Sequence, residues 1–321
     1  MNYFLVSPSY DGYENLARDE FLLDEIRPGS IALYLYINGG AVIIGRNQNP
    51  YIECNLNQLD ADGVRLVRRV SGGGAVYHDR GNLNYSFIAS NDIYDEARQT
   101  GVILKALSSF GICAEVSGRN DITAGGLKFS GNAFSARGNN RQHHGTLLIS
   151  SDLTVFSKYL TPSKQKLAAK GIKSVRARVC NLSEINPAIT VENMKKALEE
   201  AFIAEYGEAQ SYPFTEKDEK EIERLTQKHA SWEWRMGETP HFDLQLDNRF
   251  SWGMTNLLLT VENGRIAQAR VYSDSLDTEL PARLERMLTG LKYEKNALTA
   301  SLLAMGREGA ELSQYIAQTD I

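Results

Sequence analysis

A short glycine-rich stretch carries the residues of this chain that are best suited to bind an anion. Arg68 and Arg69 are followed by Ser71 and by three consecutive glycines at 72–74. Glycine inside a sheet costs roughly 0.5–1 kcal/mol relative to alanine, so three together are tolerated where the backbone must approach a bound group closely. Backbone N–H groups beside guanidinium groups form a good cradle for a phosphate. A flexible hairpin loop is the alternative explanation of the same residues.

A second stretch places Lys128 in an expected strand between Gly126 and Gly131. The flanking glycines leave room for a ligand against that strand. A lysine is rarely buried without a partner, so a plain surface position is the ordinary explanation. The functional explanation is a fixed positive charge that holds a carboxylate or a phosphate. Asp121, a few residues earlier, can either bind a divalent metal ion or cap a turn.

Two adjacent histidines, His143 and His144, lie in a third stretch with strand character. Neighbouring side chains on a strand point to opposite faces, so the two rings do not easily bind one metal ion. The sequence therefore argues against a zinc site here, and we expect one of the two histidines to line a pocket.

The elements that must position these residues alternate between strand and helix patterns. Strand patterns come in consecutive pairs, which predicts an α+β fold with a mixed, mostly antiparallel sheet and flanking helices. The turn Asn38-Gly39-Gly40 predicts a hairpin between its two flanking strands, because asparagine and glycine tolerate positive φ. The expected strands are 3–6, 31–37, 41–45, 64–70, 75–78, 82–90, 112–116, 127–135 and 145–150, and the expected helices are 11–27, 92–110, 190–206 and 215–228.

The pattern changes toward the C-terminus. An Asn263-Gly264 turn joins strands expected at 252–261 and 265–272, and helices are expected at 279–290 and 293–306. A hairpin with two helices is typical of a small domain of ~75 residues, near the usual lower size limit. We therefore expect a catalytic domain at 1–243 and a C-terminal α+β accessory domain at 244–321.

The composition excludes several classes of protein. The chain has 321 residues with 35 basic and 40 acidic side chains, a net charge of -5, whereas a protein that mainly grips nucleic acid usually has a basic surplus. The longest hydrophobic run, 31–37, is far shorter than the ~20 residues that span a membrane. The start has no signal-peptide pattern, and three cysteines without a CxxC motif argue against a disulfide framework. We therefore expect a cytoplasmic protein that binds neither nucleic acid nor membrane.

Taken together, the motifs resemble the lipoate–protein ligase A family. The resemblance rests on residues 68–82, on Gly118-Arg119-Asn120-Asp121, on Lys128-x-Ser130-Gly131-x-Ala133 and on His144-Gly145-Thr146-Leu147-Leu148. Further matches at 45–50, 170–179, 231–234 and 273–276 extend it over nearly the whole chain. The sequence is therefore similar to the long, two-domain form of the family, with a biotin/lipoate ligase-like catalytic domain.

The resemblance implies an ATP-dependent ligase that works in two steps. Lipoate and ATP, with Mg²⁺, give lipoyl-AMP and pyrophosphate. The lipoyl group then passes to a lysine of a lipoyl-acceptor domain in 2-oxoacid dehydrogenase complexes (E2 subunits) or in the glycine cleavage H protein.

The resemblance also assigns roles to single residues. Lys128 is the catalytic residue and contacts both substrates, and Asp121 is the candidate metal ligand. The implied ATP-binding residues are Arg69, Gly74, Ala75, Val76, Tyr77 and Lys128, and the implied lipoate-binding residues are Ser71, Gly72, Gly73, His78, Asn82, Lys128 and His144.

Other functions remain open from the sequence. One is octanoyl or lipoyl transfer without ATP, which in one branch uses a cysteine nucleophile. Cys54, Cys113 and Cys180 all lie outside the glycine and lysine motifs. Another is a protein that binds an acyl-adenylate without catalysis. Biotin ligation is a neighbouring activity, but the glycine-rich adenylate loop of biotin ligases has a different sequence from residues 68–74 of this chain.

Overall fold

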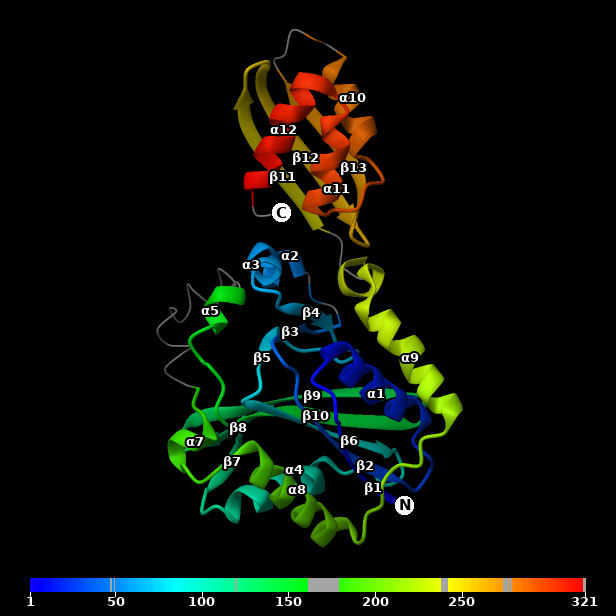
Figure 1. Ribbon diagram of the computed structural model, residues 1–321, viewed down its shortest axis with the longest axis vertical. Coiled ribbons are helices and arrows are strands. Elements are labelled where there is room, and N and C mark those ends of the chain that lie inside the picture. Colours follow the sequence, from blue (N-terminus) through cyan, green and yellow to red (C-terminus); the bar gives the residue numbers. More distant parts are fainter. Residues whose placement is uncertain are drawn as a thin grey trace. The chain divides into compact units, whose positions relative to one another are not determined.

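The structure is a computed structural model that describes residues 1–46, 48, 50–118, 120–160, 179–237, 242–273, 277 and 279–319 (Figure 1). The chain forms two compact units. One comprises Met1–Arg46 and Gln58–Ser231, and the other comprises Asn47–Asn57 and Trp232–Ile321. None of the helices in these ranges is both long and apolar enough to cross a lipid bilayer.

A seven-stranded sheet forms the centre of the first unit in the described ranges. All neighbouring strands pair antiparallel except the first two, which pair parallel. The predicted α+β fold with a mixed, mostly antiparallel sheet is therefore confirmed. Along the sheet the strands are β1 (Asn2–Val6), β2 (Ile31–Tyr36), β6 (Asn82–Ser90), β10 (Asn140–Leu148), β9 (Leu127–Arg137), β8 (Asp121–Ala124) and β7 (Ala114–Ser117).

Helices cover both faces of this sheet, as Figure 1 shows. On one face α4 (Glu96–Ser108) and α8 (Val191–Tyr206) pack against the apolar side chains of β6, Leu83, Tyr85 and Phe87. On the other face α1 (Gly12–Glu25) and α9 (Glu216–Ala230) pack around residues of β1 and β2. The alternation of β6 places its polar side chains on this second face, which also carries the predicted site.

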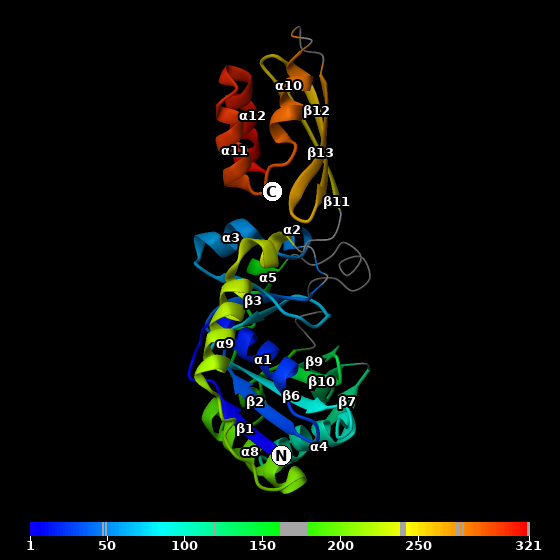
Figure 2. The same cartoon turned by 90° about the vertical axis from the view of Figure 1, so that its right-hand side faces the viewer.

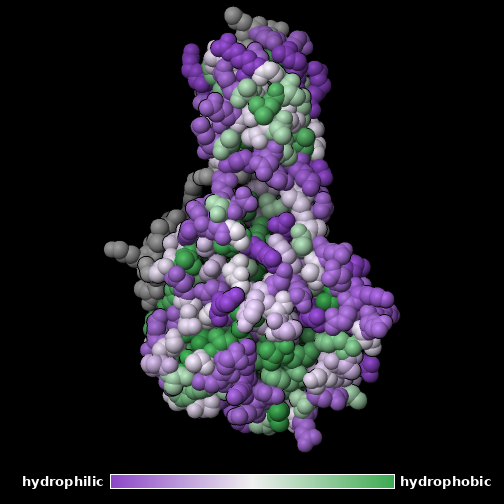
Figure 3. Space-filling model, viewed as in Figure 1, coloured by the Kyte–Doolittle hydropathy of each residue, from purple (hydrophilic) through white to green (hydrophobic). Residues whose placement is uncertain are grey.

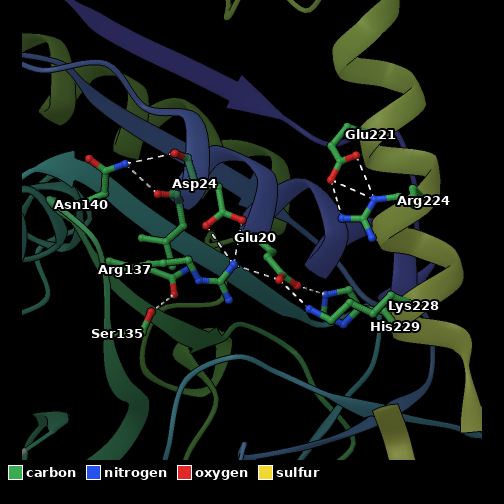
Figure 4. A network of polar contacts seen from close by, with 11 residues as sticks. Glu20, Asp24, Ser135, Arg137, Asn140, Glu221, Arg224, Lys228 and His229 are labelled. Atoms are coloured by element: carbon green, nitrogen blue, oxygen red, sulfur yellow. Dashed lines mark hydrogen bonds and ion pairs between the residues drawn. The ribbon is translucent and has the colours of Figure 1, made fainter. Parts of the chain in front are cut away.

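A cluster of charged groups holds α9 to the rest of the first unit (Figure 4). The carboxylate of Glu20 on α1 is buried and accepts hydrogen bonds from Lys228 (2.6 Å) and His229 (2.8 Å) of α9. Arg137 at the end of β9 lies 3.0 Å from the same carboxylate and also contacts Asp24. A buried carboxylate thus ties two helices and a strand together.

A second, three-stranded sheet lies beside the first, in the order β4 (Arg65–Arg68), β3 (Ala41–Ile44) and β5 (Val76–His78). The glycine-rich stretch connects β4 to β5, and β3 lies between these two strands. The stretch is therefore a crossing connection and not a hairpin loop. The predicted hairpin between 31–37 and 41–45 is also wrong, because β2 pairs with β1 and β6 whereas β3 pairs with β4 and β5.

The described ranges also contain four short helices, and their sequence patterns were too brief to predict them. They are α2 (Pro50–Glu53), α3 (Leu56–Ala61), α5 (Phe156–Tyr159) and α7 (Leu182–Ile185). Hydrophilic and hydrophobic residues are interspersed on the face that Figure 3 displays, in keeping with the ordinary composition.

The second unit is a three-stranded antiparallel sheet with helices on one face (Figure 2). Its Asn263-Gly264 turn is the predicted hairpin, and both residues have positive φ (50° and 71°). The sequence missed its first strand and its last helix. The elements are the π-helical turn Glu233–Gly237, β11 (Phe242–Phe250), β12 (Gly253–Glu262), β13 (Arg265–Ser273), α10 (Leu280–Leu288), α11 (Lys295–Leu303) and α12 (Gly306–Gln318).

The division into units differs from the expected boundary between residues 243 and 244. Trp232 already belongs to the second unit, where Lys292 Nζ lies 4.2 Å from its ring centroid. The ring of Tyr51 packs against Tyr293 at 4.7 Å between centroids, which places the segment around α2 in the same unit. These contacts join residues far apart in the sequence, so local patterns could not predict them.

Candidate active site

The glycine-rich loop lies over strands β9 and β10 of the large sheet. Ser71 Oγ is 2.6 Å from His144 Nε2 on β10, and a Cβ placed on Gly73 would be 4.0 Å from the Cβ of Ala133 on β9. His144 and Ala133 are direct partners across the two strands. The structure thus brings the first and third stretches of the sequence together on one face.

Arg69 holds this loop in shape from within. Its guanidinium donates to the carbonyl of Gly72 from Nε (3.0 Å) and Nη2 (2.7 Å), to that of Gly74 (2.8 Å) and to that of Ile43 on β3 (3.2 Å). The side chain is 8% exposed, and burial lowers the pKa of Arg69 to about 10, so it stays charged at neutral pH. Within the described ranges no acidic side chain pairs with it. A buried cation without a counter-ion favours the binding of an anion nearby.

The loop requires glycine at specific places. Gly73 has φ +95°, and a Cβ there would lie 2.7 Å from Arg69 Nη2. A Cβ on Gly45 would collide with the carbonyl oxygen of Gly73. Residues 72–74 are exposed, so their backbone groups are accessible to a ligand. The sequence predicted that glycines here let the backbone approach another group closely. At Gly73 the positive φ and the neighbouring Arg69 guanidinium both exclude a side chain.

Lys128 lies on the same strand face as the loop. Its Nζ forms an ion pair of 2.6 Å with Asp121 Oδ1 on β8, and the two side chains are 38% and 37% exposed. A Cβ on Gly131 would be 3.3 Å from that Nζ, so the ammonium group lies over bare backbone. Gly131 and Ala133 are two residues apart on β9, about 7 Å along one face. The ammonium group of Lys128 therefore lies close to the glycine-rich loop.

Asp121 offers one carboxylate beside this ammonium group. Among the described residues, no group of three histidine, cysteine, aspartate or glutamate side chains could hold a metal ion. Magnesium needs only one or two protein carboxylates when substrate phosphates supply further oxygens. The donor present fits that requirement, and the assignment of Asp121 as a metal ligand stays a prediction.

The histidines occupy opposite faces of the sheet, as expected. His143 faces the α4 side, where its ring nitrogens lie 2.8 Å from Asn132 Oδ1 and 3.2 Å from Gln99 Oε1. His144 faces the loop, and burial together with the nearby Arg69 charge lowers its pKa to about 3. His144 is therefore neutral at pH 7, and the two rings cannot share one metal ion.

Two further predicted residues leave a buried polar atom without a protein partner in the described part of the chain. His78 uses Nδ1 toward Asn38 Nδ2 (3.1 Å), and its Nε2 is unpartnered. Asn82 donates to Asn84 Oδ1 (3.1 Å), and its Oδ1 is unpartnered. Buried polar atoms are nearly always hydrogen-bonded, so each of these atoms calls for a ligand or a water molecule.

The predicted ATP-binding residues Gly74, Ala75, Val76 and Tyr77 run into β5, an edge strand of the small sheet. Val76 is 36% exposed. The ring of Tyr77 points to the opposite face from His78 and packs 5.1 Å from Tyr159 near α5. A shallow hollow of about 560 Å³ also borders Tyr77 and Asp79, away from Lys128.

Arg119 and residues 161–178, which include most of the 170–179 motif, lie outside the described residues.

Asn38 and Asn84 were missed as site residues. Both are fully buried beside the predicted residues His78 and Asn82. Asn38 was interpreted only as part of a turn, and Asn84 only as the polar face of β6. Nothing in the sequence marks either asparagine as buried, because their burial depends on contacts between distant segments.

Cys180, the cysteine next to the Lys128 strand, does not have the surroundings of a nucleophile. Burial raises the pKa of Cys180, whose backbone N–H donates to the Lys128 carbonyl at 2.9 Å. Cys54 is buried and Cys113 is exposed, and none of the three cysteines forms a disulfide. A reactive cysteine needs a lowered pKa, so acyl transfer through Cys180 is disfavoured.

Comparison with known proteins identifies the family. A family model described as "Lipoyl protein ligase A/B catalytic domain" matches residues 11–203, and one described as "Bacterial lipoate protein ligase C-terminus" matches residues 239–320. The chain belongs to the lipoate–protein ligase A family. A family member from Psychrobacter cryohalolentis, named Lipoate-protein ligase A, is 40% identical over 94% of this chain and 92% of that protein.

Solved structures of lipoate–protein ligases have the same fold. Plasmodium falciparum LipL1 in complex with lipoate is 33% identical, with a TM-score of 0.66 over 99% of this chain and 100% of that one. A bipartite lipoate protein ligase from Thermoplasma acidophilum, described together with its E2 lipoyl domain, has a TM-score of 0.67 at 28% identity over 74% of this chain and 97% of that one. A lipoate-protein ligase A bound with ATP has a TM-score of 0.64 at 28% identity over 74% and 98%. The predicted family and catalytic fold are therefore confirmed.

Proposed function

We propose that this ligase activates lipoate with ATP to lipoyl-AMP, releases pyrophosphate, and transfers the lipoyl group to a lysine of an acceptor protein. The observation that carries the proposal is the presence of two cations at the glycine-rich loop that covers β9. Arg69 lies inside the glycine loop without an acidic partner among the described side chains, and Lys128 lies over Gly131 beside that loop.

The chemistry of adenylation explains why such a placement is useful. A carboxylate is a poor electrophile, and it must attack the α-phosphate of ATP although both groups are anionic. Positive charge and oriented N–H groups reduce that repulsion and hold the two reactants in line. Lys128 is proposed to contact both the lipoate carboxylate and the α-phosphate, and it needs no covalent step of its own.

The remaining residues are proposed to divide between the two substrates. Arg69 and the backbone of Gly74, Ala75, Val76 and Tyr77 bind ATP. Ser71, Gly72, Gly73, His78, Asn82 and His144 line the lipoate site together with Lys128. Burial of the lipoyl chain contributes about 0.8 kcal/mol per methylene group.

Magnesium is proposed to accompany ATP, with Asp121 as its protein ligand. When bound, the ion neutralises phosphate charge and lets pyrophosphate leave. Asp121 can serve it from β8, one strand away from the Lys128 backbone.

The acceptors are proposed to be lipoyl domains of 2-oxoacid dehydrogenase E2 subunits and the glycine cleavage H protein. A similar archaeal lipoate protein ligase is described together with its E2 lipoyl domain, which supports an acceptor domain of this class. We further propose a cytoplasmic location, catalysis by residues 1–243 and an accessory role for residues 244–321.

Mass spectrometry of an apo lipoyl domain incubated with the enzyme, ATP, Mg²⁺ and lipoate tests the function. We expect a mass gain of one lipoyl group that depends on ATP and is accompanied by pyrophosphate release. Modification from an acyl carrier donor without ATP would instead identify a transferase. Bound lipoyl-AMP without any modified acceptor would identify a non-catalytic binder.

A further inference from the structure

A chain of buried side-chain amides runs from α1 to the predicted lipoate site and has a fixed polarity. Asn15 Nδ2 donates to the carbonyl oxygens of Ser9 (3.2 Å) and Ile37 (3.0 Å), and also to Asn38 Oδ1 (2.9 Å). Carbonyl oxygens only accept hydrogen bonds, so they fix which end of the Asn15 amide is nitrogen. Its Oδ1 correspondingly accepts from Ser7 Oγ at 2.6 Å.

This polarity passes through Asn38 to His78. Because Asn38 Oδ1 accepts from Asn15, its Nδ2 is the end that faces His78 Nδ1 at 3.1 Å. An amide nitrogen only donates, so Nδ1 of the ring must accept. Burial, aided by the Arg69 charge, lowers the pKa of His78 to about 3 and keeps the ring neutral. The single ring proton is therefore on Nε2.

That Nε2–H group is buried and has no acceptor among the side chains and backbone that the structure describes. His78 itself is 5% exposed. Asn84 and Asn82, which lie close to His78 in the sequence, form a second chain of hydrogen-bonded amides. This chain ends in an acceptor atom, whereas the first ends in a donor. Asn84 Nδ2 donates to the Tyr36 carbonyl (3.1 Å), Asn84 Oδ1 accepts from Asn82, and Asn82 Oδ1 remains as an unpartnered acceptor. His78 and Asn82 thus offer one fixed donor and one fixed acceptor.

We infer that Asn38 is a positioning residue, which holds His78 as a hydrogen-bond donor from Nε2 to the acid substrate. The inference rests on the proposed function, because that function places His78 beside bound lipoate. The acceptor on the substrate is either a carboxyl oxygen or a sulfur of the dithiolane ring. Octanoate has the same carboxyl group and lacks the sulfurs, so a comparison of the two acids distinguishes these acceptors.

The variant Asn38→Asp tests the inference with almost no change of shape. A carboxylate still accepts from Asn15 but cannot donate to His78, so the ring proton should move to Nδ1. The acid substrate then loses its donor, and we expect the KM for lipoate in adenylation to rise about tenfold or more. The KM for ATP should change by less than about twofold, because the nucleotide does not use this donor. If the KM for octanoate rises as much as the KM for lipoate, the acceptor is the carboxyl group. If it rises less, the acceptor is a sulfur of the dithiolane ring.

Gln99→Glu is the matched control. It makes the same amide-to-acid change against another buried histidine, His143, on the opposite face of the sheet. Its effect on lipoate KM should be negligible even if it lowers the unfolding temperature. A rise as large as that of Asn38→Asp would overturn the inference.

Nitrogen-15 NMR of the histidine rings reads the tautomer without any activity assay. In the wild-type protein His78 should carry its proton on Nε2 from pH 5 to 8, and its Nε2 signal should shift when lipoate is added. A proton on Nδ1, or no shift with a saturating acid, would overturn the inference even if Asn38→Asp fails to fold. An unchanged lipoate KM in a folded Asn38→Asp variant with its proton on Nδ1 would do the same. Failure of wild-type enzyme to modify any acceptor would instead contradict the proposed function.

Discussion

Lys128 Nζ lies 2.6 Å from Asp121 Oδ1, and more than a third of each side chain remains exposed. The pair joins neighbouring strands β8 and β9 and spans no part of the hydrophobic core. An exposed ion pair of this kind contributes little to the free energy of unfolding. The lysine is therefore held in place while it stays available to a carboxylate that competes with Asp121.

Replacing Lys128 with alanine should abolish adenylation and leave the fold intact. The variant loses the charge that offsets repulsion between carboxylate and phosphate, so lipoyl-AMP formation should fall about 10³-fold or more. Pyrophosphate release measures the activity, and circular dichroism with thermal unfolding measures the fold. Lys195→Ala removes a lysine from an ion pair with Glu192 on α8, in which the lysine side chain is 16% exposed and the glutamate 77%, and it should retain activity. Normal lipoyl-AMP formation by Lys128→Ala would remove this residue from the mechanism.

The variant Asp121→Asn tests whether Asp121 binds Mg²⁺ or only pairs with Lys128. The amide keeps the shape but is a weaker magnesium ligand, so the Mg²⁺ concentration for half-maximal adenylation should rise severalfold. The measurement is the rate of pyrophosphate release against Mg²⁺ at saturating ATP and lipoate. A lower maximal rate at an unchanged half-saturating Mg²⁺ concentration would show that Asp121 serves only Lys128.

Gly73→Val should block the binding of both substrates. A side chain at φ +95° is strained, and its Cβ would displace the Arg69 guanidinium that binds the carbonyls of Gly72 and Gly74. Isothermal titration with lipoate and with ATP should show affinity losses of at least about 100-fold, as expected for loss of several hydrogen bonds. Gly72→Ala provides the comparison for stability, because open space surrounds that position. Unchanged lipoate affinity in Gly73→Val would contradict the proposal that the glycine-rich loop binds the substrates.

The parts of the site that sequence could predict are those set by a few adjacent residues. The requirement for glycine at 73 follows from local backbone conformation, and the opposite directions of His143 and His144 follow from strand geometry. The same local logic predicted the α+β class and most of the described strands, but it missed β8 and β11.

The parts that could not be predicted depend on contacts between distant segments. Ser71 meets His144 across 73 residues, and Asn38 meets His78 across 40. The sequence also assigned Asn38 to a hairpin turn, whereas it lies just after β2 in the connection to β3, which belongs to another sheet. A turn residue and a buried positioning residue have the same local signature, and only the sheet order separates them.

Glu20→Gln should destabilise the first unit by loosening α9 from α1. The carboxylate is 3% exposed and receives hydrogen bonds from Lys228, His229 and Arg137. Removing one partner of a buried ionic cluster leaves the others without compensation. We expect a loss of about 3 kcal/mol, at the low end for buried pairs because Lys228 and Arg137 remain partly exposed to water. Urea unfolding at pH 7 measures this difference.

The same variant should change how stability depends on pH. Burial alone would raise the pKa of Glu20, but hydrogen bonds from His229 and Lys228 hold it far below its usual 4.5. The unfolded chain therefore takes up a proton as pH falls through about 4.5 while the folded protein does not, and wild-type stability declines there. Glu20→Gln lacks that contribution, so the difference between the two proteins should be largest at neutral pH and shrink below about pH 4.5. Glu221→Gln, which breaks an exposed pair with Arg224 on the same helix, should leave both stability and its pH profile nearly unchanged. A difference between wild type and Glu20→Gln that stays constant from pH 7 to pH 3 would show that the Glu20 charge does not hold α9.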